Sequence, residues 1–334
     1  MFIIKVVSGL RSAACKNTMI DFKRILALII LITFPIRILF AAPGATGMDF
    51  LKIVTGARQA GMGGASVALG DDINTIQSNP SGLAMLNKNE VSFTHLIWFE
   101  DITYDCMSFV FPTKVYGTFG GGVNMLRHGD IQGYDSAGMA TENVSAYDLT
   151  VTLSAGRSVS WMDNDDTGLF AGASIKLVQE RLYDKTATVI AIDAGGMYAP
   201  GLKIAGSVMK LGVCVENIGQ NIKFMQAEGK LPINLKFGTT FEKELKENNL
   251  LVSVDGNVPF ERDFYYCIGG EFWYGDFIAV RAGYNSRNDL NNGISLGIGI
   301  KGHGKPGCTF QIDHSFVPYD KLGDTHRISV TVKF

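Results

Sequence analysis

The sequence predicts an all-β fold: a transmembrane outer-membrane β-barrel of about 14 antiparallel strands with an N-terminal plug or hatch segment. Three observations predict it. From Glu90 to the last residue, short segments with apolar residues at every second position follow one another, with turn residues between them. Glycine is abundant, at 39 of 334 residues, and only 19% of residues are charged. The single long apolar stretch lies near the N-terminus.

Composition excludes several other classes. An apolar content of 46% with few charges excludes a disordered chain. Five cysteines in 334 residues are too few for a disulfide scaffold, and one apolar stretch cannot build a bundle of membrane-spanning helices. The net charge of −2 offers no basic surface for nucleic acid, so we expect no nucleic-acid partner.

Residues 1–42 have the layout of a cleaved signal peptide. Lys23 and Arg24 precede an apolar run from Ile25 to Phe40, and Ala41-Ala42 supply the small residues of a cleavage site. Met19 is a candidate true start. The alternative is a retained anchor helix, which Pro35 and Arg37 argue against. Removal of residues 1–42 leaves a mature chain with a net charge of −7. We therefore expect export to the outer membrane of a Gram-negative-type bacterium.

The mature chain divides into two predicted parts. Residues 43–88 are rich in glycine and alanine and lack strand alternation, which favours a compact plug inside the barrel or at its mouth. Residues 89–334 form the predicted barrel. Its fourteen expected strands are 90–99, 104–111, 116–126, 144–158, 168–181, 186–198, 204–217, 232–244, 249–258, 263–274, 277–285, 292–302, 307–317 and 325–334.

Strand alternation alone fits a soluble barrel, with its apolar face inside, or a membrane barrel, with that face toward lipid. The strand lengths and the even strand number favour the membrane. Aromatic residues near strand ends suggest interfacial girdles: Trp98, Phe99, Phe109, Phe111, Phe272 to Tyr274, Tyr284 and Phe316. The two longest expected connections, 127–143 and 218–231, fall on one side of such a barrel. The last strand ends on Phe334, the expected signal for the barrel insertion machinery.

No catalytic motif is present, so we expect no enzymatic activity and no cofactor. The motif His-Glu-x-x-His and phosphate-binding loops are absent. The five histidines have no metal-ligand spacing, so we expect no metal. His314-Ser315 would place its two side chains on opposite faces of a strand. The four cysteines after the signal are interpreted as isolated apolar thiols, with a disulfide between neighbouring strands as the alternative.

Charged residues on the predicted inner strand faces carry both signs. An open, ion-selective porin would show one sign more strongly, whereas mixed signs favour salt bridges across a narrow, plugged interior. The candidates for inward charges are Lys176, Asp193, Glu216, Lys236, Asp255, Glu271, Arg281, Lys301 and Asp313.

Several motifs in the mature chain occur in one order that resembles a known family. They are Gly56-Ala-Arg-Gln-Ala-Gly-Met-Gly-Gly-Ala65, the Asp71-Asp72 pair, Asn79-Pro-Ser-Gly-Leu-Ala84, Glu216-Asn-Ile-Gly219, Leu231-Pro-Ile-Asn-Leu-Lys-Phe-Gly238 and Val317-Pro-Tyr-Asp-Lys-Leu-Gly-Asp-Thr-His-Arg327. This pattern resembles the PorV/PorQ branch of the FadL-like (long-chain fatty-acid transporter) superfamily, except that Ser81 stands where alanine is usual. The resemblance implies a fourteen-stranded barrel with an N-terminal hatch.

The resemblance leaves two functions open. Fatty-acid-transporter relatives move hydrophobic molecules across the outer membrane, whereas PorV-like relatives receive exported protein cargo in type IX secretion. We expect outer-membrane lipid as a partner in both cases. The further partner is a hydrophobic ligand for the first function and an exported protein for the second. A gating role and a rigid structural turn are equally compatible with the hatch motifs. The hatch candidates are Arg58, Gly61, Gly63, Gly64, Asp71, Asp72, Asn79, Pro80 and Gly82.

Overall fold

The computed structural model describes residues 46–129, 131–159, 167–224, 227–287, 293–304, 306–319 and 322–334. The predicted signal peptide, residues 1–42, lies outside the described residues and stays a prediction. Among the described residues, no helix is long and apolar enough to cross a membrane.

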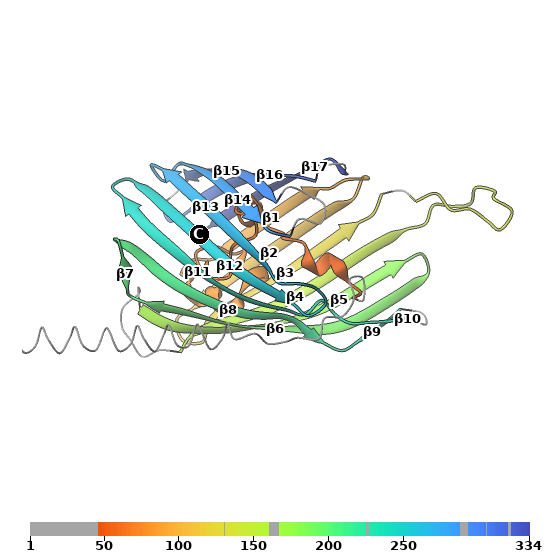
Figure 1. Ribbon diagram of the computed structural model, residues 1–334, viewed down its shortest axis with the longest axis horizontal. Coiled ribbons are helices and arrows are strands. Elements are labelled where there is room, and N and C mark those ends of the chain that lie inside the picture. Colours follow the sequence, from red (N-terminus) through yellow and green to blue (C-terminus); the bar gives the residue numbers. More distant parts are fainter. Residues whose placement is uncertain are drawn as a thin grey trace, which may run out of the picture. The chain divides into compact units, whose positions relative to one another are not determined.

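Fourteen long strands form one antiparallel ring (Figure 1). They are β1 Glu90–Ile97, β2 Thr103–Thr113, β3 Gly117–Arg127, β4 Ala146–Ser158, β5 Thr167–Leu182, β6 Lys185–Pro200, β8 Ser207–Gly219, β11 Asn234–Leu245, β12 Asn248–Pro259, β13 Tyr265–Tyr274, β14 Ile278–Asn285, β15 Ile294–His303, β16 Thr309–Pro318 and β17 Asp324–Lys333. Three short strands complete the set: β7 Lys203–Ile204 pairs with β8, and β9 Ile222–Phe224 pairs with β10 Ala227–Gly229. Each predicted strand corresponds to one long strand.

The ring closes between its first and last strands. β1 pairs with β17 from Glu90↔Lys333 to Ile97↔His326. Beyond that register, Asn89 and Phe334 exchange two backbone hydrogen bonds of 3.0 and 2.9 Å. Since β8 also pairs with β11, each long strand has a neighbour on both sides. Closure removes the sheet edges that lipid could not satisfy, and the predicted fourteen-stranded barrel is confirmed.

Apolar side chains point outward and small or polar ones inward. On β17, Ile328 and Val330 are 46% and 40% exposed, whereas the alternating Ser329 and Thr331 are 1% and 4% exposed. The same inversion runs along β15, where isoleucines alternate with buried serine and glycine. A soluble barrel would bury the apolar face instead. The soluble alternative is therefore wrong, and the exposed face is suited to lipid.

The connections distinguish the two ends of the barrel. The longest, residues 128–145 and 220–233, lie at one end, which we call the long-loop end. β1 begins and β17 ends at the opposite, short-loop end. There the β11–β12 connection is only Lys246 and Glu247, and Lys246 adopts a positive φ of 59° that permits the tight reversal. We expect the long-loop end to face outside the cell.

Residues 46–89, which we call the N-terminal segment, contain four short helices: η1 Asp49–Lys52, α2 Ala57–Gly61, α3 Thr75–Ser78 and η2 Pro80–Met85. Helix α2 contacts β14 to β17, and η2 contacts β3 to β6. Thr46 bridges Lys230 at the long-loop end, and Asn89 leads into β1 at the short-loop end. The segment therefore runs along the inner face of the ring, as the red-to-orange ribbon shows (Figure 1).

Two aromatic residues assigned to the outer girdle face inward instead, so that interpretation was wrong for them. Trp273 is 8% exposed, and the ammonium group of Lys301 lies 4.2 Å from its ring centre. Trp98 packs against an interior apolar cluster. Position near a strand end does not tell which face a side chain takes, because that depends on register. Phe109 and Phe111 are about half exposed, as a girdle requires.

Candidate functional site

A buried arginine joins the N-terminal segment to the barrel wall near the short-loop end. Arg58, in α2, is 5% exposed and donates five hydrogen bonds to three carboxylates. Its Nε and Nη2 bond both oxygens of Glu271 on β13, at 2.8 and 2.6 Å. The remaining bonds, of 2.7 to 2.8 Å, go to Asp71 and Asp72 of the segment itself. Bidentate arginine pairs of this kind fix orientation strongly.

The network continues along the wall. Arg281, opposite Glu271 in the β13–β14 register, donates from Nε to Glu271 at 2.5 Å. Its Nη1 lies 2.8 Å from Asp313 on β16. Lys333, the last residue of β17, donates to the backbone oxygen of Asp71 at 2.9 Å. We call Arg58, Asp71, Asp72, Glu271, Arg281 and Asp313 the arginine latch.

The electrostatics of the arginine latch predict a pH dependence. Burial raises the pKa of Asp71, but the Arg58 guanidinium outweighs this effect and holds that pKa below its usual value of 3.8. A lowered folded-state pKa contributes stability that is complete above the unfolded value and is lost as pH falls through the folded value. We therefore expect protease protection of residues 71–89 to be unchanged from about pH 8 to about pH 5 and to weaken only below about pH 4.

Loss of protection already near neutral pH would contradict this prediction. The digestion uses proteases that stay active in acid and cleave at the same sites at each pH. Peptide yields measured by mass spectrometry then distinguish a loss of protection from a change in protease activity.

A row of wall glycines accommodates the Asn79-Pro80 turn. Gly156, Gly172 and Gly195 are in direct register across β4, β5 and β6. A Cβ atom at Gly156 would lie 2.7 Å from the Pro80 oxygen, and one at Gly172 would overlap the Pro80 carbonyl group. Only residues without a side chain let the turn approach the wall this closely.

Asn79 holds this turn together from within. It is fully buried, and its Nδ2 donates to the Val67 oxygen at 2.8 Å. Its Oδ1 accepts from the backbone and hydroxyl of Ser81, at 3.2 and 2.6 Å. Gly82 follows, packed so closely that a Cβ there would overlap the Thr75 hydroxyl. The contacts describe a rigid, fully bonded turn.

A second glycine row holds the Gly61-Met62-Gly63 stretch on the other side of the ring. Gly269 and Gly283 face each other across β13 and β14, and Gly297 lies on β15. A Cβ at Gly269 would lie 2.5 Å from the Met62 oxygen, and one at Gly283 would overlap the Gly63 backbone. Gly63 and Gly64 have positive φ angles of 69° and 87°, which favour glycine.

Among the other predicted inward charges, four form two salt bridges. Lys176 contacts Asp193 at 2.6 Å, and Lys236 contacts Glu216 at 2.7 Å. Both pairs join neighbouring strands, β5 with β6 and β11 with β8, so the expectation of salt bridges across the interior was wrong for them. Asp255 instead accepts the backbone N–H groups of the segment's Ser66 and Val67, at 2.5 and 2.9 Å.

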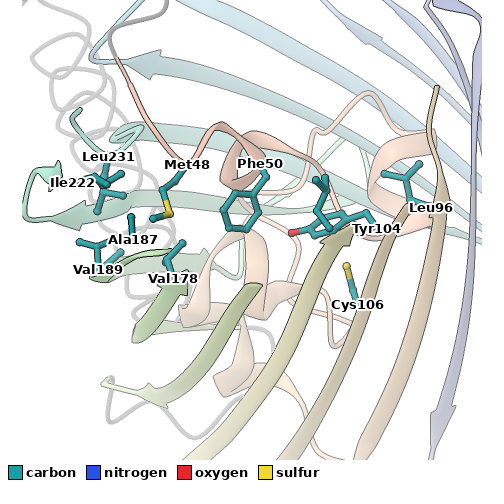
Figure 2. Packing of buried hydrophobic residues seen from close by; sticks show 12 residues of the cluster. Met48, Phe50, Leu96, Tyr104, Cys106, Val178, Ala187, Val189, Ile222 and Leu231 are labelled. Atoms are coloured by element: carbon teal, nitrogen blue, oxygen red, sulfur yellow. The ribbon is translucent and has the colours of Figure 1, made fainter. Parts of the chain in front are cut away.

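An apolar cluster occupies the interior at the long-loop end (Figure 2). Met48 and Phe50 of the N-terminal segment point toward side chains from several strands. The buried members of this cluster, which we call the apolar vestibule, are Met48, Phe50, Leu96, Tyr104, Cys106, Leu126, Val178, Ala187, Val189, Ala191, Ile222 and Leu231. The other apolar clusters among the described residues have at most five buried members, so the size of this one requires a separate explanation.

An open cavity of about 610 Å³ borders the apolar vestibule. Met48, Phe50 and Ile53 line it from the segment, and Leu126 lines it from β3. Its rim is polar: His128 and Asp148 lie 3.6 Å apart there. This volume lies in the range of pockets for small ligands.

Sequence reasoning placed Met48 and Phe50 in the plug but did not select them as site residues. Their role depends on partners such as Leu96 and Val189, which lie far away in the chain. An apolar pair ahead of a glycine-rich stretch is the only local signal.

The described residues give no support for a disulfide or a metal site. Cys106, Cys214, Cys267 and Cys308 are free thiols, so the alternative of a disulfide among them was wrong. No group of three or more His, Cys, Asp or Glu side chains in the described part of the chain could hold a metal ion.

Among the comparisons with known proteins, those with solved structures bear on the fold. Residues 42–176 match the model of an uncharacterised protein family (UPF0164), and no curated protein matches the chain. Among solved structures, the CymD monoaromatic hydrocarbon channel matches with a TM-score of 0.54 and 13% identity, over 84% of this chain and 96% of that one. The Ralstonia pickettii toluene transporter TbuX matches with a TM-score of 0.54 and 14% identity, over 83% and 97%.

The Pseudomonas putida toluene transporter TodX gives a similar match, with a TM-score of 0.53 and 13% identity over 83% of this chain and 96% of that one. This chain has the fold of these outer-membrane channels. At such low identities the likeness extends to the fold alone.

Proposed function

We propose that the protein is a non-enzymatic outer-membrane channel that takes up small hydrophobic molecules. The apolar vestibule is the observation that carries the proposal. Its twelve buried apolar or weakly polar residues form the largest of four apolar clusters among the described residues, and this cluster borders an open cavity of about 610 Å³. The hydrocarbon and toluene channels that share its fold support the same class of ligand.

The N-terminal segment is then the gate. Its first residues, Met48 and Phe50, form part of the ligand surface at the long-loop end. Its later residues fasten to the wall through Arg58, the Asn79-Pro80 turn and the two glycine rows. We propose that ligand reaching the vestibule leaves it only after this segment shifts. In this account the hatch candidates hold the closed state.

Replacing Phe50 with serine should weaken binding of a hydrophobic fluorescent probe. Burying a phenylalanine side chain is worth about 1.5–3 kcal/mol, so the dissociation constant should rise about tenfold or more. The measurement is titration of the purified barrel with N-phenylnaphthylamine, monitored by fluorescence.

The control is Tyr134→Ser, which changes an exposed aromatic residue outside the vestibule. It should leave the dissociation constant unchanged. If both variants bind the probe like the wild type, the vestibule is not the binding site.

One observation favours a secretion or attachment barrel as the second candidate. The connection 128–145 contains two isolated bridges, Ile131↔Val144 and Tyr134↔Ala140. Tyr134 and Met139 at its far end are 66% and 67% exposed. An apolar tip of this kind suits a protein partner. Photocrosslinking from Tyr134 in cells should then capture exported cargo; capture of lipid alone would count against this candidate.

The finer predictions rest on sequence alone. Membership of the PorV/PorQ branch, type IX cargo, a cleaved signal peptide and recognition of Phe334 by the insertion machinery are not needed for uptake. Phe334 is 55% exposed at the short-loop end, where a terminal signal is accessible.

A further inference from the structure

One buried arginine inside the barrel has no carboxylate partner among the described residues. The described part of the chain buries four lysine and arginine side chains, and three of them contact carboxylates: Arg58, Lys176 and Arg281. The fourth, Arg327 on β17, is 3% exposed and forms no ion pair with a described residue. Buried charges in proteins are normally paired, so this unpaired guanidinium requires an explanation.

The protein groups around Arg327 are neutral. Its Nε donates to the backbone oxygen of Val54 at 3.1 Å, and its Nη1 donates to the Thr325 hydroxyl at 3.3 Å. Tyr319 is a third neutral neighbour of the guanidinium. The remaining nitrogen, Nη2, donates to neither of the first two acceptors and is not enclosed by protein atoms. A guanidinium offers five donors and matches the two oxygens of a carboxylate, so this one retains capacity for an anionic ligand.

Arg327 lines a cavity of about 230 Å³ at the long-loop end, which we call the cationic pocket. Trp98 and Tyr319 line the same pocket, and their ring centres lie 6.4 Å apart. Phe99 packs against both rings, with centre distances of 5.2 and 6.1 Å. Val317 adds an apolar side chain to the lining. The pocket therefore combines a buried cation with an aromatic and apolar surface.

The other charged side chains of the lining do not cancel this cation. They are Lys52, Arg287 and Asp49. Lys52 contacts Asp49 at 2.8 Å and Glu261, which lies outside the lining, at 3.0 Å. With Glu261 counted, the pocket has three cations and two carboxylates. An excess of positive charge at a buried site favours an anion.

We propose that the cationic pocket binds a small aromatic carboxylate of the size of benzoate. The carboxylate accepts hydrogen bonds from Arg327, and the ring lies against Trp98 and Tyr319. A cavity of about 150 Å³ is enough for benzene, so the pocket has room for a ring with one carboxyl group. The site adds an anionic ligand class to the proposed uptake of hydrophobic molecules and does not rest on that uptake.

Benzoate and benzamide provide a matched pair of probes, because they have nearly the same shape and only benzoate is charged at neutral pH. The experiment titrates the purified full-length barrel with each probe and follows binding by ligand-detected NMR. Hydrogen bonds to charged groups are among the strong ones. We therefore expect the dissociation constant of benzoate to be about tenfold or more below that of benzamide.

Variants assign this preference to Arg327. Arg327→Met removes the charge and should bring the dissociation constant of benzoate up to that of benzamide, whereas Arg327→Lys keeps the charge and should retain part of the preference. The control is Arg127→Met, which removes an exposed arginine at the end of β3, outside the lining of the pocket. It should bind both probes like the wild type. Heat-modified gel migration verifies that each barrel folds.

Three results would overturn the proposal. The first is equal dissociation constants for the two probes in the wild type, a result that needs no variant to fold. The second is a preference for benzoate that persists in Arg327→Met, and the third is a preference lost equally in Arg127→Met. Because this test follows benzoate and the test of the vestibule follows N-phenylnaphthylamine, either proposal can fail while the other stands.

Discussion

Replacing Arg58 with methionine will release the N-terminal segment from the wall and raise the conductance of the barrel. The change leaves Glu271 buried beside Arg281 with two of its three charge-assisted bonds lost. Breaking a buried ion pair by removing one partner costs about 3–5 kcal/mol. Single-channel recording in planar bilayers measures the result.

The matched control is Arg157→Met, which removes an exposed arginine from β4 without touching the arginine latch. It should conduct like the wild type. Arg58→Lys tests geometry separately, because lysine keeps the charge but not the planar fork that bonds both Glu271 oxygens. It should give an intermediate conductance. An Arg58→Met barrel that conducts like the wild type would show that the latch does not hold the segment.

Replacing Gly283 with alanine should have the second largest effect. The added methyl group would overlap the Gly63 backbone. Because the overlap is between strand β14 and the main chain of the N-terminal segment, no flexible side chain can move aside to relieve it. Overpacking of this kind costs about 1–3 kcal/mol. We expect residues 57–70 to lose protection from hydrogen exchange, while the strands keep theirs.

Gly270→Ala is the control for this substitution. Gly270 lies on the neighbouring strand β13, where a Cβ meets no atom within 4 Å. Exchange in residues 57–70 should be unchanged. Equal loss of protection in both variants would mean that any alanine in this part of the wall disturbs the barrel, and that the glycine row does not determine docking.

The barrel could be predicted from sequence because its signal is local. In the last strand, Ile328 and Val330 alternate with Ser329 and Thr331, and each pair of neighbours reveals the period without knowledge of the partner strand. Summed over fourteen strands, this signal determined the fold class. The direction of the apolar face needed extra evidence, which the strand lengths and the even number of strands supplied.

The partner of each buried charged side chain could not be predicted, because it depends on how the strands pair in the assembled ring. Arg58 and Glu271 are 213 positions apart, and the sequence around either residue does not indicate that the other is its partner. For the same reason, Lys176 was expected to pair across the interior but pairs with Asp193 on the adjacent strand. Trp98 was assigned to the outer girdle, although its register turns it toward the vestibule.

The glycine rows could be predicted in part. The excess of glycine was visible, and its placement on inner strand faces was expected at Gly297. Only the pairing of three strands brings a row of glycines into register opposite Pro80. These glycines are Gly156, Gly172 and Gly195. Composition thus indicated close packing, and topology decided where it occurs.

The central claim is that the barrel carries hydrophobic molecules across an outer membrane. Uptake of N-phenylnaphthylamine by intact Gram-negative cells tests it most directly, comparing cells with the wild-type barrel, with the Phe50→Ser variant and with no barrel. We predict an initial rate that is several-fold higher with the wild type than without it, and a smaller increase with Phe50→Ser. Equal rates in all three, with both proteins present in the membrane at equal amounts, would contradict the claim.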